Sequence, residues 1–148
     1  AIMAFFNGMN ISATGMTSQR LIMDTIAQNI ANVNTTRDED GNVYRRKTVV
    51  FAEKNAPNFR QVFSSALNKS SGYGVKVTEI VEDNETPMTM AYDPSHPDAD
   101  EEGYVSYPNV NTVTEMTNLI DASRAYEANV TAFNASKSIT LKGLEIGK

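Results

Sequence analysis

The residues with the greatest potential for chemistry lie in one short acidic segment. Asp98, Asp100, Glu102 and Gly103 occupy positions one, three, five and six of a calcium-binding loop of the EF-hand type, which needs closely spaced oxygen ligands and a glycine turn. Position twelve of such a loop is Asn109, where a bidentate glutamate is required. The pattern therefore favours a solvated acidic loop. The alternative to a non-enzymatic protein is therefore a soluble metal-binding or hydrolytic domain that uses residues 98–102.

Other catalytic candidates are few. The single histidine, His96, lies between Pro94 and Pro97, and this spacing predicts an ordered turn and not a general base. The chain contains no cysteine and no nucleophile elbow, and Gly72 and Gly74 lack the third glycine of a dinucleotide loop. The sequence therefore predicts a protein that is not an enzyme and has no catalytic residue, cofactor or bound metal.

Charge and hydropathy exclude further classes. A net charge of -5 argues against a nucleic-acid partner, because phosphate binding needs clustered Lys and Arg. The one basic run, Arg45, Arg46 and Lys47, precedes a β-branched stretch and is predicted to be the exposed side of a strand. No run approaches 18 apolar residues, so we expect no integral membrane protein. The N-terminus lacks a signal-peptide pattern, so departure from the cytoplasm would need another route.

The distribution of charge divides the chain into three predicted parts. Residues 1–36 and 111–148 are nearly neutral and are expected to form helical arms that together make one helical unit. The middle, residues 37–110, is expected to be a central β-rich domain, and within it residues 37–102 carry eight basic and thirteen acidic side chains. Two neutral arms therefore flank an acidic centre.

The first arm has a helical pattern. Ile2, Met9, Met16, Met23 and Ile30 recur every seven residues, which predicts a helix with a heptad-like seam that is weak at Ser12 and Gln19. Gly8 and Gly15 each lower helix propensity by about 1 kcal/mol relative to alanine. The isolated arm is therefore expected to be marginal and to need a partner.

The last arm repeats this pattern. Leu119, Tyr126 and Phe133 form one row, and Met116 and Val130 belong to the adjoining row. Thr112 is the predicted N-cap, with Glu115 three residues later as in a capping box.

Between the arms, short strands are predicted. Residues 43–51, 74–81, 88–92 and 103–105 are rich in β-branched and aromatic side chains. Asp40 and Gly41 favour a tight hairpin turn, and residues 56–71 fit either a short helix or a loop. The predicted fold class is α+β, with long N- and C-terminal helices packed as a coiled-coil-like pair around a small central antiparallel β domain.

Several of these segments resemble a known family. Residues 29–35, Asn-Ile-Ala-Asn-Val-Asn-Thr, preceded by Gly15, Gln19 and Ile26, are similar to the N-terminal signature of flagellar rod and hook proteins. Residues 92–94, 96–100, 103–105 and 108–111 resemble the proximal-rod members of the flagellar basal-body rod protein family, and residues 122–129 continue the likeness. It covers nearly the whole chain except about residues 54–72.

The resemblance implies a structural subunit of the proximal rod, which polymerises through its terminal helices into a hollow, torque-transmitting shaft. The implied partners are other rod proteins, further copies of the chain, and components of the basal body and export gate. It also implies export through the flagellar type III secretion channel without a cleaved signal peptide. The implied location is the basal body outside the cytoplasmic membrane, in the periplasm or cell-wall zone. A secretion chaperone is a rival, but it would be wholly helical.

The apolar rows on both arms are predicted to be the assembly interface. A seam of this length at both ends exceeds what one small core normally needs. Asn29 and Asn32 are candidates for hydrogen bonds across packed helices. The predicted interface residues are Met9, Met16, Met23, Ile26, Asn29, Ile30, Asn32, Met116, Leu119, Tyr126, Val130 and Phe133.

Overall fold

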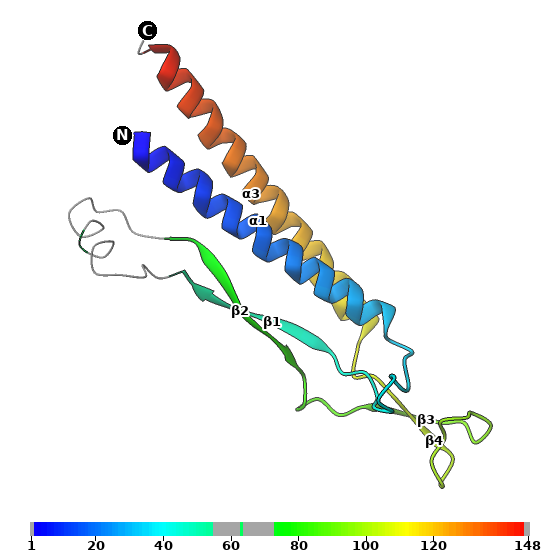
Figure 1. Cartoon of the computed structure of the whole chain (residues 1–148). Coiled ribbons are helices and arrows are strands. Elements are labelled where there is room, and N and C mark those ends of the chain that lie inside the picture. The colour runs from blue at the N-terminus through cyan, green and yellow to red at the C-terminus, as the bar shows by residue number, and fades with distance from the viewer. Residues whose placement is uncertain (1, 55–62, 64–72, 147–148) are drawn as a thin grey trace. The chain divides into compact units, whose positions relative to one another are not determined.

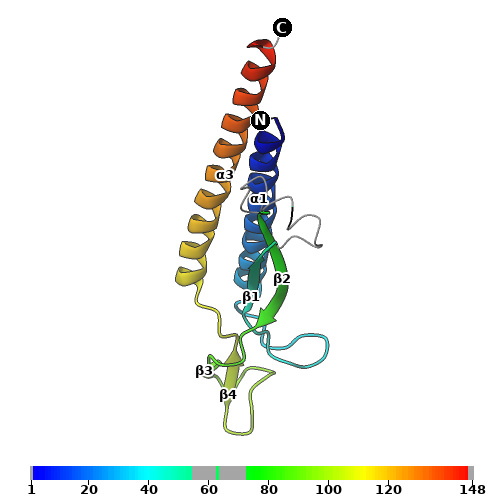
Figure 2. The same cartoon turned by 90° about the vertical axis from the view of Figure 1, so that its left-hand side faces the viewer.

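Two long helices dominate the computed structural model, which describes residues 2–54, 63 and 73–146, with the backbone alone for residues 2–5. Helix α1 (Ile2–Ala31) and helix α3 (Thr112–Ile146) lie side by side in both views (Figures 1 and 2). The described strands between them form two small antiparallel sheets. The predicted α+β class with packed terminal helices is confirmed. The predicted helix or loop over residues 56–71 lies, apart from Phe63, outside the described residues.

The first sheet pairs β1 (Lys47–Glu53) with β2 (Val75–Glu82). The Asp83 N–H donates to Arg46 O at 2.8 Å at one end of the pair, and the Lys54 N–H donates to Gly74 O at 2.9 Å at the other. The strands are therefore antiparallel. Strand β1 begins four residues later than predicted.

The second sheet is the hairpin of β3 (Thr89–Tyr92) and β4 (Tyr104–Tyr107). Met90 pairs with Ser106 and Tyr92 with Tyr104, so these four side chains share one face. Ala91 and its partner Val105 lie on the other face, and Val105 is fully buried. The hairpin thus buries one face within the chain and presents the other to solvent.

The chain divides into two compact units. Unit 1 comprises Ala1–Leu21, Val50–Glu79 and Ala122–Lys148, and unit 2 comprises Ile22–Val49 and Ile80–Asp121. Each unit contains part of both helices and part of the first sheet, and unit 2 also contains the β3–β4 hairpin. The division into arms at 36 and 110 expected from charge remains a prediction.

Small residues line the close approach of α1 to α3 in unit 1. A Cβ atom on Gly15 would lie 2.9 Å from Cγ of Asn129, closer than real contacts allow. Ser12 and Ser18, three residues on either side of Gly15, are buried, whereas Met16 is only half-buried. The face of α1 that packs most closely is therefore polar and small, and Ser12, which interrupts the predicted apolar seam, belongs to it.

Thr14 connects α1 to the start of β2 in unit 1. Its hydroxyl donates to Ile11 O at 2.6 Å and accepts from the Val75 N–H at 3.2 Å. Gly74, which precedes β2, has a φ of 90°, and a Cβ there would collide with the Thr14 hydroxyl. A glycine is therefore required by both backbone conformation and space.

Helix α3 begins with a cap that differs from the predicted one. Asn111 is the N-cap, since its Oδ1 accepts from the Val113 and Thr114 N–H groups at 3.0 and 3.2 Å. The prediction that Thr112 caps the helix is wrong by one residue. Glu115 is then one position too far along the helix to complete a capping box, and its carboxylate has other partners.

Candidate functional site

The acidic segment between β3 and β4 consists of turns. The Asp100 carboxylate accepts from the Glu102 and Tyr104 N–H groups at 3.0 and 2.8 Å, and Gly103 has a φ of 85°. Asp98 accepts from the Thr36 hydroxyl at 2.7 Å and pairs with Arg37 Nε at 3.1 Å. The carboxylates therefore serve the backbone and a neighbouring loop. Within the described residues, no three His, Cys, Asp or Glu side chains are grouped to hold a metal ion.

His96 is part of an ordered turn, as predicted. The backbone N–H of His96 donates to Asp93 O at 3.2 Å, and the imidazole Nδ1 accepts from the backbone N–H of Asp98 at 3.1 Å. Hydrogen bonds from the Ser95 hydroxyl and then the Ser95 N–H hold the pKa of the Asp93 carboxyl below its usual 3.8. These groups stabilise a loop, and the alternative reading as a metal-binding or hydrolytic domain is not supported.

Among the described residues, one of the two polar side chains with no exposed surface lies where α1 ends in unit 2. Asn29 is fully buried, and its Nδ2 donates to Lys47 O at 2.8 Å and to Glu115 Oε2 at 3.0 Å. Its Oδ1 accepts from the Lys47 N–H and the Tyr44 hydroxyl, both at 2.9 Å. All four hydrogen-bonding positions of the amide are thus used. Asn29 pairs with the backbone at the start of β1 and bonds across to α3.

The carboxylate of Glu115 is the second buried group of this network. Its side chain is 1% exposed, and Oε1 accepts from Arg46 Nε at 2.7 Å. The prediction that the basic run is simply the exposed side of a strand is wrong for Arg46, which precedes β1 and is largely covered. A buried carboxylate requires a cation and hydrogen bonds, and Arg46 and Asn29 supply them.

Asn109 extends the network to the segment that precedes α3. Its Oδ1 accepts from the Arg46 N–H at 2.8 Å, and its Nδ2 donates to Asp83 O and Thr86 O at 3.0 and 3.1 Å. Hydrogen bonds from the Thr86 N–H and then its hydroxyl hold the pKa of the Asp83 carboxyl below 3.8. Five segments of unit 2 therefore meet through hydrogen bonds that these side chains make to one another and to the backbone. We call Asn29, Tyr44, Arg46, Asn109 and Glu115 the junction.

Tyr44 is the titratable group of the junction whose pKa is raised. Burial favours the neutral phenol, and the carboxylates of Glu82 and Glu115 disfavour a phenolate nearby, so the pKa lies above 10.0.

This shift predicts a loss of stability at alkaline pH. The contribution of Tyr44 is fully present below pH 10 and is lost as the pH rises through the higher pKa of the folded state, because only the unfolded chain then releases the proton. Between pH 9 and 11 the free energy of unfolding of the natural chain should fall more steeply than that of Tyr44→Phe. Urea denaturation at several pH values measures both slopes; parallel slopes would show that the phenol titrates equally in both states.

The predicted interface residues differ in their exposure. Ile26 and Asn29 are buried within the chain, and Met116 is exposed. Asn32 donates to Gln28 O at 2.9 Å and accepts from Thr35, so its bonds remain at its own helix end, whereas Asn29 bonds across to α3. The others, all half-buried, are Met9, Met16, Met23, Ile30, Leu119, Tyr126, Val130 and Phe133.

A more exposed apolar row, of which the predicted interface includes one residue, lies at the start of α3. Val113, Met116 and Ile120 follow the spacing of one helix face, and they are 75%, 52% and 53% exposed. We call them the α3 row. Only Met116 was among the predicted residues, although the spacing of three and four is present in the sequence. An apolar row of this kind, uncovered in the single chain, is typical of a surface that contacts another protein.

Glu115 holds the end of α1 and the start of α3 together from within this same segment. Met116 is the next residue, so the junction fixes the orientation of the α3 row in unit 2. The site therefore offers rigid helical surface and buried polar bonds. No described helix has the length and apolar character needed to cross a membrane.

Comparison with known proteins shows which proteins this chain is similar to. A model of flagella basal body rod proteins matches residues 9–37, and a model of the C-terminal part of flagellar basal body rod FlgEFG proteins matches residues 101–146. The chain is 46% identical to the flagellar basal-body rod protein FlgC of Borreliella burgdorferi, over 97% of this chain and 98% of the relative. It is 44% identical to FlgC of Bacillus subtilis and 38% identical to FlgC of Escherichia coli O6:H1, in each case over 99% of this chain and all of the relative.

Proposed function

The chain belongs to the FlgC family of flagellar basal-body rod proteins, and on this premise we propose that it polymerises through α1 and α3. As a rod component of the basal body, it interacts with other rod components. Its relatives are structural proteins, and we propose that this chain likewise has no enzymatic activity and transmits torque as part of a hollow shaft.

The observation that supports this assembly mode is the α3 row. Three large apolar side chains at helical spacing remain exposed beside a junction that holds their helix rigidly. Burying them against a neighbouring subunit gains about 25 cal/mol per Å² of apolar surface. A subunit that forms a helical assembly needs such a surface, because heterologous contacts that do not close into a ring continue into a rod.

The half-buried residues of both helices complete the proposed interface. Met9, Met16 and Met23 on α1, together with Tyr126 and Phe133 on α3, each keep part of their surface uncovered. Methionine adapts its shape to different neighbours, which suits a helix that meets more than one subunit. Ile26 and Asn29 act in this scheme from inside the chain, by packing and bonding within unit 2. We further propose export through the flagellar secretion channel without signal cleavage, a location outside the cytoplasmic membrane, and contacts with the export gate.

A single charge in the α3 row tests the proposal. In a motile bacterium whose own FlgC gene is replaced by this one, Ile120→Asp should reduce complete rods and swimming cells at least about tenfold, because a buried unpaired carboxylate is strongly unfavourable at an interface. Asn84→Asp adds the same charge at an exposed turn and should leave both unchanged. Electron microscopy of basal bodies counts the rods. Normal rods with Ile120→Asp, in a variant whose circular dichroism matches the natural chain, would rule out this face.

A further inference from the structure

The solvent face of the β3–β4 hairpin is a second apolar surface of unit 2. Met90, Tyr92 and Tyr104 lie on the face opposite the buried Val105, and Tyr92 is 66% exposed. The two tyrosine rings meet edge to face, with centroids 5.2 Å apart. Gly103 lies against them, since a Cβ there would be 3.0 Å from the Tyr92 ring. The face is thus preformed and contains large side chains that contribute strongly to protein contacts.

A cavity continues from this face toward the segment that follows α1. Its volume is about 150 Å³. A cavity needs only about 15 Å³ to hold one water molecule, so this one admits the head group of a side chain. Tyr104 and Ser106 belong both to the hairpin face and to the cavity wall. The rest of the wall comes from two loops and includes Thr36, Arg37, Asp98 and Asp100. The cavity and the face therefore form one continuous surface within unit 2.

Hydrogen bonds within the wall decide which groups remain for a ligand. The Asp98 carboxylate is already used, because it accepts from the Thr36 hydroxyl and pairs with Arg37 Nε. The Asp100 carboxylate accepts from two backbone N–H groups, both at Oδ1, so Oδ2 is the oxygen that a further donor would reach. The cavity thus offers a ligand one carboxylate oxygen, the ring of Tyr104 and the hydroxyl of Ser106.

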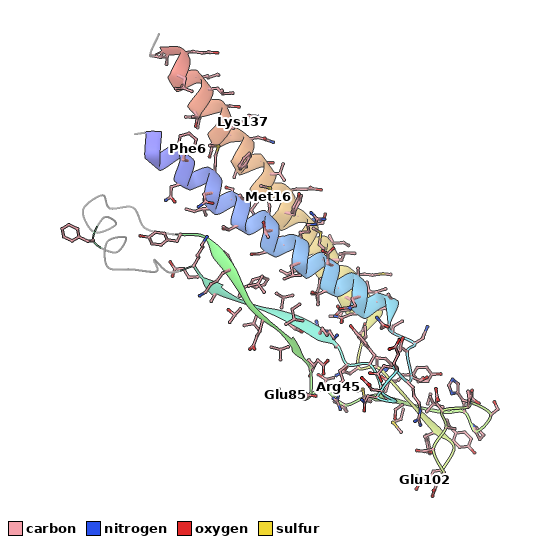
Figure 3. All side chains as sticks on the ribbon, viewed as in Figure 1. Phe6, Met16, Arg45, Glu85, Glu102 and Lys137 are labelled. Carbon is pink, nitrogen blue, oxygen red and sulfur yellow. The ribbon has the colours of Figure 1, made fainter. Side chains whose placement is uncertain are left out.

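The surroundings of the cavity are strongly negative. The two bordering segments, residues 36–43 and 93–103, contain eight carboxylates, one arginine and no lysine. Glu101 and Glu102 are exposed, and Figure 3 shows Glu102 in the loop that connects the two strands, away from Glu85 in the plane of the view. Such a field attracts a cation and repels an anion. A ligand for this surface must therefore combine a positive charge with apolar groups.

We propose that the cavity receives an arginine side chain of another rod component, whose apolar neighbours rest on the hairpin face. A guanidinium is planar, so it can lie against the ring of Tyr104 while its N–H groups donate to Asp100 Oδ2 and to the Ser106 hydroxyl. An ammonium is more strongly hydrated and has no flat surface for the ring, which makes lysine the weaker ligand. The contact rests on the proposed rod function, because a neighbour in the rod supplies the arginine.

Charge complementarity favours a different protein over a second copy. The arginines of unit 2 already bond within the chain. In the described part of unit 1, Arg20 is four residues from Asp24 in the sequence, and Arg124 is three from Glu127. Opposite charges at these spacings on a helix offset each other. An arginine with apolar instead of acidic neighbours meets the negative surface without repulsion, so the occupant is a segment of another rod component.

Three short peptides measure the chemistry of the cavity on the full-length chain. They are acetyl-Leu-Arg-Leu-amide, its lysine equivalent, and its citrulline equivalent, in which a neutral urea replaces the guanidinium. Amide NMR shifts at 50 mM NaCl should give a dissociation constant of about 1 mM for the arginine peptide and at least tenfold weaker binding for citrulline. The shifts should centre on residues 36–43 and 98–106. Equal binding of the arginine and citrulline peptides, or of arginine and lysine, would overturn arginine as the ligand, and shifts elsewhere would overturn the cavity.

Two aspartates that hold turns provide matched variants. Asp100→Asn keeps an Oδ1 acceptor for the two N–H groups but removes the charge from the cavity, and should weaken binding of the arginine peptide about tenfold. Asp93→Asn makes the same change outside the cavity wall, where Oδ1 accepts from Ser95, and should weaken binding less than twofold. Ser106→Ile suits a strand and fills the cavity, so it should abolish binding. Equal effects of the two asparagine variants, or full binding by Ser106→Ile, would overturn the site.

A cross-link identifies the partner in cells that assemble this chain. Tyr104→p-benzoylphenylalanine places a photoreactive ring at the cavity wall, and irradiation should join it to an arginine-containing segment of another rod component, identified by mass spectrometry. If this variant forms no rods, the same substitution at the exposed Glu102 replaces it. A cross-link to a second copy, or none in cells with normal rods, would overturn the partner and leave the rod function standing. Normal rods with Ile120→Asp would instead reject the helical interface and leave this contact intact.

Discussion

Arg46→Ala is expected to lower the free energy of unfolding by about 3 kcal/mol, because it leaves the carboxylate of Glu115 buried without its cationic partner. Arg46 Nε lies 2.7 Å from the Glu115 carboxylate, and the Glu115 side chain is 1% exposed. Water therefore has little access to the carboxylate and does not replace the arginine as its partner. Asn29 would still donate to the carboxylate, but a neutral amide compensates a buried charge only in part. Urea denaturation followed by circular dichroism measures the change.

Two variants make the Arg46 result specific. Arg45→Ala removes the adjacent arginine, whose guanidinium only reaches Asp83 O at 3.4 Å, and should cost less than about 1 kcal/mol. Adding Glu115→Gln to Arg46→Ala removes the unpaired charge and should restore part of the lost stability. Equal costs for Arg45→Ala and Arg46→Ala, or no recovery with Gln at 115, would show that water reaches the carboxylate.

Gly15→Leu should cost about 2 kcal/mol, because the new side chain has no space between α1 and Asn129 of α3 in unit 1. Helix propensity alone would make leucine more stable than glycine by about 1 kcal/mol. The steric conflict at Asn129 must exceed this gain for Gly15→Leu to lower the free energy of unfolding. Asn129 cannot simply move away, since its Nδ2 donates to Ala125 O at 2.8 Å. Thermal and urea unfolding of the full-length chain measure the change.

Gly8 is the matched control on the same helix. A Cβ there would lie 3.7 Å from Ser136 Oγ, an ordinary contact, so Gly8→Ala should stabilise the chain by about 0.5 to 1 kcal/mol. Gly15→Ala should stabilise the chain less than Gly8→Ala does, or should destabilise it. Adding Asn129→Ala to Gly15→Ala should raise the free energy of unfolding, because it removes the side chain that the new Cβ meets. If Gly15→Ala and Gly8→Ala stabilise equally, the helices are farther apart at Gly15 than the structure places them.

These two predictions concern residues whose roles the sequence alone did not reveal. From the sequence, Gly15 was a weak point in a helix and a member of the family signature, and Arg46 was one member of an exposed basic run. Both interpretations follow from helix and strand propensity, which is set by near neighbours. Arg46 and Glu115, however, are 69 positions apart, and Asn29 and Glu115 are 86 apart. No local pattern specifies which of the many carboxylates an arginine will meet.

The sequence by itself determined the elements, the α+β class and the family. Apolar spacing, β-branched runs and turn residues act over a few positions, so both helices and all four described strands were predicted, with ends displaced by several residues. The tertiary structure decided which face of each element is used. It buried small polar residues of α1 where an apolar seam was expected, made Asn111 the cap of α3, and left Val113 and Ile120 uncovered. The physical reason is that burial and pairing depend on segments far apart in sequence, whereas helix and strand formation depend on neighbours.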